Sequence, residues 1–276
     1  MSRFENIAVF EDTVSVCEKS SRLIESIKTS RNTQIFIGEK ECLSDASKTK
    51  RFEKEAEIII SKKRTFEAAQ DYAKLGEKVA VLNFASSTNP GGGVVNGAGA
   101  QEECLCRSSN LYCGLTIPYL LRNYYKANSR TTGDMGTDAV IWSPDVTVFK
   151  SDDEVPIMLD TPFEVDVLTC AAPYYDSGKK HPVPMEQLAD IFYHRILNIL
   201  NVAAANDVDS IVLGAFGCGA FNNPPDLVAE AFYRVLVEKQ YRDYFRNIVF
   251  AIKKNDRDNS NLRAFKDRLS AGSDGV

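Results

Sequence analysis

The chain has 276 residues, of which 44% are hydrophobic and 26% are charged, a composition that excludes a collagen-like or wholly disordered protein. Lys and Arg number 33 against 38 Asp and Glu, so the formal net charge is −5. A protein that binds a nucleic-acid backbone over an extended surface needs that surface to be basic. We therefore expect no direct binding to the DNA backbone.

The N-terminal sequence MSRFENIAVFED carries four charged residues where a signal peptide would need an unbroken apolar stretch. No run approaches the roughly 18 apolar residues of a membrane span. The seven cysteines are an odd number in a chain too large to need disulfide bonds for its stability. We expect an intracellular, cytoplasmic protein without a membrane partner, with the nucleus as the alternative location in a eukaryote.

Residues 1–56 predict an accessory region that packs on a core, rather than an independent domain. A mostly helical stretch at Thr13–Lys28 precedes a short strand-like piece at Gln34–Ile37. The core is expected to span residues 57–270, and residues 271–276 are expected to form a loose tail.

From Glu57 onward the pattern alternates between strands and helices. Apolar, β-branched runs predict strands at Glu57–Ser61, Val79–Phe84, Ala139–Trp142, Val165–Thr169, Ser210–Phe216 and Asn247–Ile252. Helices are predicted at Thr65–Lys74, at Glu102–Leu111, at Leu188–Ala203 after Pro184, and after the pair Pro224-Pro225. This alternation predicts an α/β fold, a sheet covered by helices, with ligands at the carboxyl ends of the strands.

Two glycine-rich loops directly follow predicted strands. The first, ASSTNPGGGVVNGAGA, contains three consecutive glycines, Gly91–Gly93, which indicate that something approaches the backbone closely. The second spans Gly214–Phe221, where successive glycine amides can form an anion-binding nest. Neither loop matches GxxxxGK[ST] or GxGxxG. One such loop is more often a structural turn, but two at strand ends favour a binding site.

A pair of carboxylates, Glu102 and Glu103, follows the first loop. Acidic residues favour the first turn of a helix, which explains one of them but not the pair. Adjacent helical side chains point about 100° apart, so one faces the loop while the other braces its rim. Repulsion and enclosure raise the pKa of one carboxyl, whereas the helix N-terminus favours the charged form. The sequence leaves open which effect wins.

The stretch NFASSTNPGGG, then seven residues, then QEECLCRSSNLY resembles the signature of the bacterial-type (microbial) poly(ADP-ribose) glycohydrolases. The segments TFEAAQ, IWSPDVTVFK, TCAAP and GAFGCGAFNNPP are similar to the same family and occur in the same order, so the resemblance covers about Glu57 to Ile252. It implies a macrodomain fold, a mixed sheet sandwiched between helices, with an N-terminal accessory region.

The resemblance also implies hydrolysis of the ribose–ribose O-glycosidic bond of poly(ADP-ribose), with ADP-ribose as product and with no cofactor or metal. It makes Glu103 the general acid and base and Glu102 the neighbour that holds the ribose hydroxyls. TCAAP (Thr169–Pro173) would lie near the adenine. The expected substrate-binding residues are Asn89, Gly91, Gly92, Gly93 and Gln101 around the ribose, Gly217, Cys218, Gly219 and Ala220 at the diphosphate, and Phe221 against the ribose.

Two alternatives remain on this fold. One is a mono-ADP-ribosyl hydrolase that acts on an ADP-ribosylated protein or nucleic acid, and the other is a non-catalytic ADP-ribose-binding macrodomain. Because a binding module has no need of either carboxylate, the pair Glu102-Glu103 favours an enzyme.

The remaining reactive side chains are interpreted as structural. Cys104, Cys106 and Cys113 lack a histidine or second cysteine pair at zinc spacing, so buried thiols are the favoured interpretation. His194 is expected on a helix surface. His181 lies in the loop GKKHPVP, where the rim of a cleft is the alternative to a plain surface position.

Overall fold

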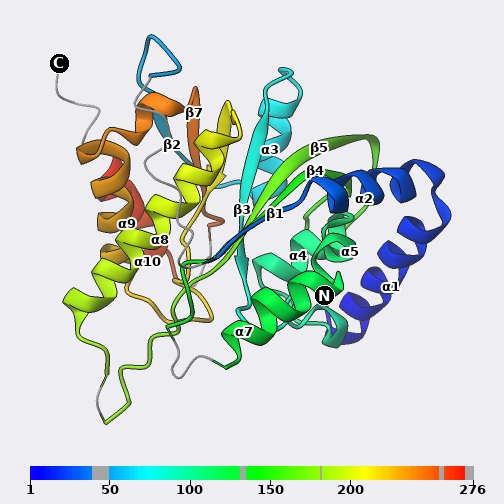
Figure 1. The fold of residues 1–276 in the computed structure, drawn as a ribbon, viewed down its shortest axis with the longest axis horizontal. Coiled ribbons are helices and arrows are strands. Elements are labelled where there is room, and N and C mark those ends of the chain that lie inside the picture. The colour runs from blue at the N-terminus through cyan, green and yellow to red at the C-terminus, as the bar shows by residue number, and fades with distance from the viewer. Residues whose placement is uncertain (39–49, 131–134, 181, 255–257, 271–276) are drawn as a thin grey trace.

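The computed structural model describes residues 1–38, 50–130, 135–180, 182–254 and 258–270; the predicted tail at 271–276 lies outside this range. The described residues form a seven-stranded mixed sheet with helices on both faces (Figure 1). The predicted sandwich of a sheet between helices is therefore confirmed.

The carboxyl ends of four strands lie at one edge of the sheet. They are β1 Ile35–Ile37, β2 Glu57–Ser61, β3 Val79–Ala85, β4 Val140–Lys150, β5 Met158–Ala171, β6 Ser210–Leu213 and β7 Asn247–Ala251, in the spatial order β1-β4-β5-β3-β6-β7-β2. β3 is parallel to β5 and β6, β7 is parallel to β6 and β2, and β4 is antiparallel to β1 and β5. The carboxyl ends of β3, β5, β6 and β7 consequently point to the same edge, where ligands bind in such sheets.

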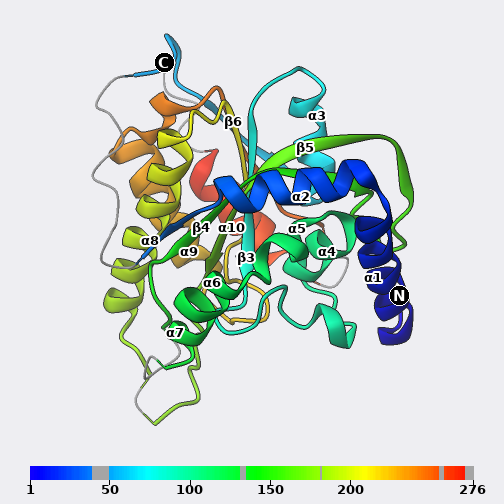
Figure 2. The same cartoon turned by 45° about the vertical axis from the view of Figure 1, so that its right-hand side comes forward.

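Helices form a layer on each face (Figures 1 and 2). They are α1 Arg3–Lys19, α2 Ser21–Thr33, α3 Thr65–Ala73, α4 Gln101–Ser108, α5 Leu111–Leu115, α6 Pro118–Leu120, α7 Lys126–Asn128, α8 Met185–Ala205, α9 Pro225–Tyr233 and α10 Ser260–Leu269. Ala80 and Leu82 of β3 face the core under α8, α9 and α10, whereas Val79 and Val81 face the core under α3, α4 and α5. No helix in the described part of the chain combines the length and the apolar character that crossing a bilayer needs.

The N-terminal helices differ from the prediction. The helix predicted at Thr13–Lys28 is two helices, α1 and α2, which meet at Ser20, whose backbone is extended and whose hydroxyl caps α2. The buried side of α1 consists of Asn6, Phe10, Thr13 and Cys17. Because half of this stripe is polar, apolar periodicity does not reveal the first ten residues of the helix.

Other boundaries also shift. The helix predicted at Glu102–Leu111 ends at Ser108, because Ser109 is extended and bridges to Val148 before α5 begins. β4 continues eight residues beyond the predicted end at Trp142, through an irregularity at Asp145, whose φ is +53°. The strand predicted at Val165–Thr169 begins earlier, at Met158, and extends to Ala171.

The strand predicted at Ser210–Phe216 ends at Leu213, where the glycine loop begins. The C-terminal helix α10 and the short helical turns of residues 118–128 carry no signal that the sequence interpretation used.

The N-terminal region reaches the sheet itself. β1 pairs antiparallel with β4, with Phe36 opposite Ile141, and α2 packs on β4. The division of the chain at residue 56 stays a prediction.

Candidate active site

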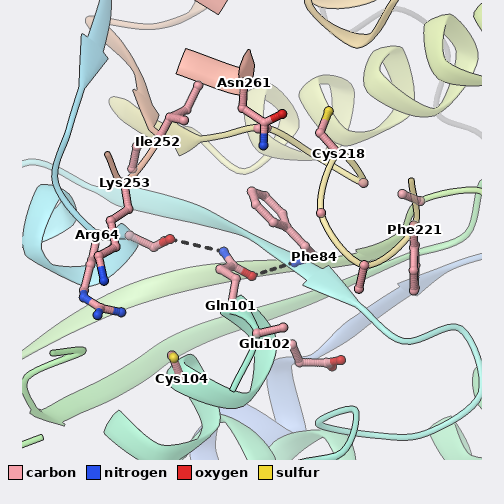
Figure 3. Close-up of a pocket in the computed structure, with 18 of the residues that line it drawn as sticks. Arg64, Phe84, Gln101, Glu102, Cys104, Cys218, Phe221, Ile252, Lys253 and Asn261 are labelled. Carbon is pink, nitrogen blue, oxygen red and sulfur yellow. Dashed lines mark hydrogen bonds between the residues drawn. The ribbon is translucent and has the colours of Figure 1, made fainter. Parts of the chain in front are cut away.

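A cavity of about 1160 Å³ opens at the carboxyl edge of the sheet. In Figure 3, Gln101 and Glu102 lie on one side, Cys218 and Phe221 on the other, and Arg64 and Lys253 at the far end. The predicted residues that line it are Gly92, Gln101, Glu102, Glu103, Gly217, Cys218, Gly219, Ala220 and Phe221.

Gln101 fastens the start of α4 to the sheet. Its Nε2 donates to the carbonyl of Leu82 at 2.7 Å. The same Nε2 donates to Thr65 Oγ1 at 3.2 Å, and Oε1 accepts from the amide of Phe84 at 2.9 Å (Figure 3). Both ends of the amide are thus used within the protein. Gln101 therefore fixes the place from which the next two residues project.

Glu102 is a buried carboxyl, 3% exposed. Its Oε2 accepts from the amide of Ser86 at 2.7 Å, and its Oε1 from Asn83 Nδ2 at 3.4 Å. Burial raises the pKa of Glu102 to about 8 despite these donors, and the charge of Glu103 adds to the rise. Glu102 accordingly carries a proton at neutral pH, which answers the question that the sequence left open.

Glu103 is 7% exposed. Its Oε1 accepts from the amide of Gly93 at 2.8 Å, whereas its Oε2 is buried and has no hydrogen-bond partner among the described residues. Buried polar atoms are normally paired, so an unpaired carboxylate oxygen on a residue that lines a cavity marks a place for a ligand atom.

The first glycine loop closes on both carboxyls at Gly92. This residue has φ +60°, and a Cβ there would lie 2.5 Å from Glu103 Oε1 and 3.0 Å from Glu102 Oε2. Gly91, with φ +69°, packs toward Tyr112 instead, and the exposed Asn89 donates to Thr88 Oγ1. The loop therefore brings Gly92 and the Gly93 amide to the carboxyls, but places neither Gly91 nor the Asn89 side chain in the cavity wall.

Contacts with Ala172 and Asn223 hold the second glycine loop in place. Gly217 has φ +76°, and a Cβ there would lie 2.5 Å from the Cβ of Ala172, in the TCAAP segment. Asn223 Nδ2 donates to the carbonyls of Pro173 at 2.7 Å and Gly217 at 2.9 Å. This arrangement holds the loop against the carboxyl end of β5.

The outer part of the same loop offers free donors. Within the described part of the chain, the backbone amides of Gly219, Ala220 and Phe221 have no hydrogen-bond acceptor. The Phe221 ring packs edge-to-face on Tyr174 at 6.2 Å between centroids. Unpaired amides on a cavity wall provide the donors that a phosphate oxygen needs.

Two asparagines that shape this site are not among the residues predicted from the sequence. Asn83 Nδ2 lies 3.4 Å from Glu102 Oε1 and 3.2 Å from Thr169 Oγ1, and Asn223 braces the second loop. Asn83 is the single polar residue of the strand VAVLNF, and a polar side chain in a buried strand is a signal that could have found it. The wall supplied by α10, including Asn261, carries no such signal.

The other candidate side chains lie as follows. Cys104 lines the cavity and burial raises its pKa, while Cys106 is fully buried. No cluster of three or more histidine, cysteine or carboxylate ligands suited to a metal occurs in the described ranges. His194 is exposed on α8, as predicted, and His181 lies outside the described residues.

The chain is similar in sequence and in structure to the proteins of one enzyme family. The family model for the catalytic domain of microbial-type PARG, poly(ADP-ribose) glycohydrolase, matches residues 7–151. PARG from Thermomonospora curvata is similar with a TM-score of 0.85 and 29% identity, over 95% of this chain and 98% of that one. Its complex with the inhibitor ADP-HPD aligns over the same shares with a TM-score of 0.81 and 26% identity. PARG from Deinococcus radiodurans in complex with ADP-ribose aligns with a TM-score of 0.81 and 32% identity, over 89% and 97%. No curated protein matches the sequence.

Proposed function

This chain belongs to the microbial-type poly(ADP-ribose) glycohydrolase family, and we propose that Glu103 is its general acid and base. The fold is the macrodomain-like fold of that family, and the activity is that of a glycosidase, which hydrolyses poly(ADP-ribose) and yields ADP-ribose. The observation that carries the role of Glu103 is that this residue lines the cavity while its buried Oε2 has no described protein partner.

The bond to be broken joins C1 of one ribose to a hydroxyl oxygen of the next, so the leaving oxygen needs a proton. The two carboxyls converge at Gly92. We assign delivery of this proton to Glu103 Oε2, the oxygen that no described protein group occupies. The resulting carboxylate then takes a proton from the water that attacks C1.

A single carboxyl in both steps departs from the usual glycosidase pair, in which two separated carboxyls take opposed roles. Glu102 in its protonated form is suited to hold a ribose hydroxyl without adding a second negative charge beside Glu103. The diphosphate of the substrate, held by the amides of Gly219 and Ala220, would stabilise the positive charge that develops at C1. Phe221 would form the wall that orients the ribose.

We also propose an intracellular, cytoplasmic location. The six described cysteines, which include Cys17, Cys104 and Cys218, are free thiols. Free thiols are the common state in a reducing compartment.

The decisive experiment compares wild type with Glu103→Gln on automodified poly(ADP-ribose). We expect the variant to bind ADP-ribose about as tightly as wild type and to release it from polymer at least about 100-fold more slowly, because proton transfer is lost. The exposed Glu238→Gln is the matched control. Undiminished turnover by Glu103→Gln would remove Glu103 from its role. Wild type that acts on a mono-ADP-ribosylated protein but not on polymer would change the substrate class.

A further inference from the structure

The first turn of helix α1 contacts the first glycine loop. Asn6 is 8% exposed, and its Nδ2 donates to the carbonyl of Gly97 at 3.0 Å. Gly97 has φ +73°, and a Cβ there would collide with the carbonyl oxygen of Arg3. The N-terminal helix and the spacer between the glycines and the carboxyls are therefore packed backbone against backbone.

The contact is connected to Glu103 by two further hydrogen bonds. The amide of Ala98, next to Gly97, donates to the carbonyl of Gly93 at 3.1 Å. The amide of Gly93 donates in turn to Glu103 Oε1 at 2.8 Å. The side chain of Asn6 thus holds the segment that sets the orientation of the Glu103 carboxylate.

A separate set of contacts holds the middle of α1. Thr13 Oγ1 lies 2.6 Å from the carbonyl of Arg107 in α4, and it accepts from Lys150 Nζ at 2.8 Å. Lys150, which is buried in β4, also pairs with Asp12 at 2.6 Å. Because these contacts do not involve Asn6, loss of the Asn6 amide leaves α1 docked and affects chiefly the loop.

We propose that α1 is part of the catalytic apparatus and that Asn6 is a positioning residue for Glu103. This inference rests on the proposed role of Glu103. It assigns the N-terminal region a function in turnover, in addition to the edge strand that it supplies. The role is orientation: the reacting groups must be held within a fraction of an ångström, and a misplacement of about 1 Å costs about 100-fold in rate.

The test measures kcat and KM on poly(ADP-ribose), Kd for ADP-ribose and Tm for five proteins. Asn6→Ala removes the side chain, and Asn6→Leu keeps the volume but removes the donor. The matched control is Asn206→Ala, whose Nδ2 donates to the carbonyl of Val202 at 2.8 Å at the end of α8, outside the cavity. Wild type is the reference.

We expect kcat to fall about tenfold in both Asn6 variants, with Kd for ADP-ribose changed less than about threefold, because the second loop and the cavity walls are untouched. The control should stay within about twofold of wild type in kcat. Gly97→Ala, which presses on α1 from the other side of the contact, should lower kcat at least as much.

Two results would overturn the inference alone: Asn6 variants that match Asn206→Ala in kcat, or variants in which kcat, ADP-ribose affinity and Tm all fall together. A wild-type protein that releases no ADP-ribose from polymer would instead overturn the proposed function, and this inference with it.

Discussion

Glu102→Gln replaces a buried carboxyl by a neutral side chain of the same shape, so it tests whether the carboxyl is protonated in the folded protein. The pKa of Glu102 is raised from 4.5 to about 8, mainly by burial. A carboxyl whose pKa is higher in the folded than in the unfolded chain makes stability depend on pH. The glutamine removes that dependence.

The sign and size follow from the two pKa values. Below pH 4.5 the carboxyl is protonated in both states, and stability is full. As the pH rises from 4.5 toward about 8, the unfolded chain releases the proton while the folded protein keeps it, so stability falls; above about 8 the loss is constant. At about 1.4 kcal/mol per pKa unit, the wild type loses about 3 kcal/mol between pH 4.5 and neutrality through this group.

The assay is urea unfolding of wild type and Glu102→Gln from about pH 4.5 to about pH 8.5, followed by the fluorescence of Trp142, the single tryptophan, which is 2% exposed. The amides of Ser86 and Asn83 both donate to the carboxyl, so the glutamine also loses hydrogen bonds, but this loss is a constant offset. Buried carboxyls elsewhere, such as Asp166, are common to both proteins and cancel.

We expect the free energy of unfolding of the variant, relative to wild type, to rise by about 3 kcal/mol between pH 4.5 and 7 and to level off above about pH 8. A difference that stays flat across this range would mean that Glu102 is ionised in the folded protein. The neutral Glu102 of the proposed mechanism would then be wrong.

Two further predictions concern the glycine loops. Gly92→Ala places a Cβ 2.5 Å from Glu103 Oε1, so release of ADP-ribose should fall at least about 100-fold. Gly76→Ala, where φ is +76° and nothing lies within 4 Å of the added Cβ, controls for backbone strain. Equal activity of the two variants would contradict the argument. Asn223→Ala removes the brace of the second loop, so the affinity for ADP-ribose in calorimetry should fall about tenfold. Asn206→Ala, which lies outside the cavity, should bind about as wild type does. An unchanged Kd in Asn223→Ala would show that the brace is dispensable for binding.

The sheet and both loops could be predicted because their signals are local. β3 is an apolar run interrupted only by Asn83, as expected of a strand buried on both faces, and the loop that follows it contains the three consecutive glycines Gly91–Gly93. Helix α1 was missed from Arg3 to Asp12 because its buried stripe includes Asn6 and Thr13, which bind backbone atoms rather than pack in a core. Hydrophobic periodicity does not detect a helix whose buried side chains are polar.

The protonation state of Glu102 could not be predicted from the sequence, for a different reason. Glu102 and Glu103 are adjacent, yet their partners are Asn83 and Ser86 for one and Gly93 for the other. The balance between burial and hydrogen-bond donors arises only when the strand, the loop and the helix are packed together. Tertiary structure alone decides which carboxyl stays neutral.

The two edge strands of the sheet are neighbours in sequence, although they lie at opposite edges. β1 pairs with β4 and β2 with β7, so a chain leaving the ribosome has exposed both strands long before Val140–Lys150 and Asn247–Ala251 emerge. Such non-local pairing slows folding and leaves unpaired strands exposed to aggregation. Because the cavity wall at Ser260–Leu262 is made later still, ADP-ribose can stabilise only a chain that has been made as far as α10.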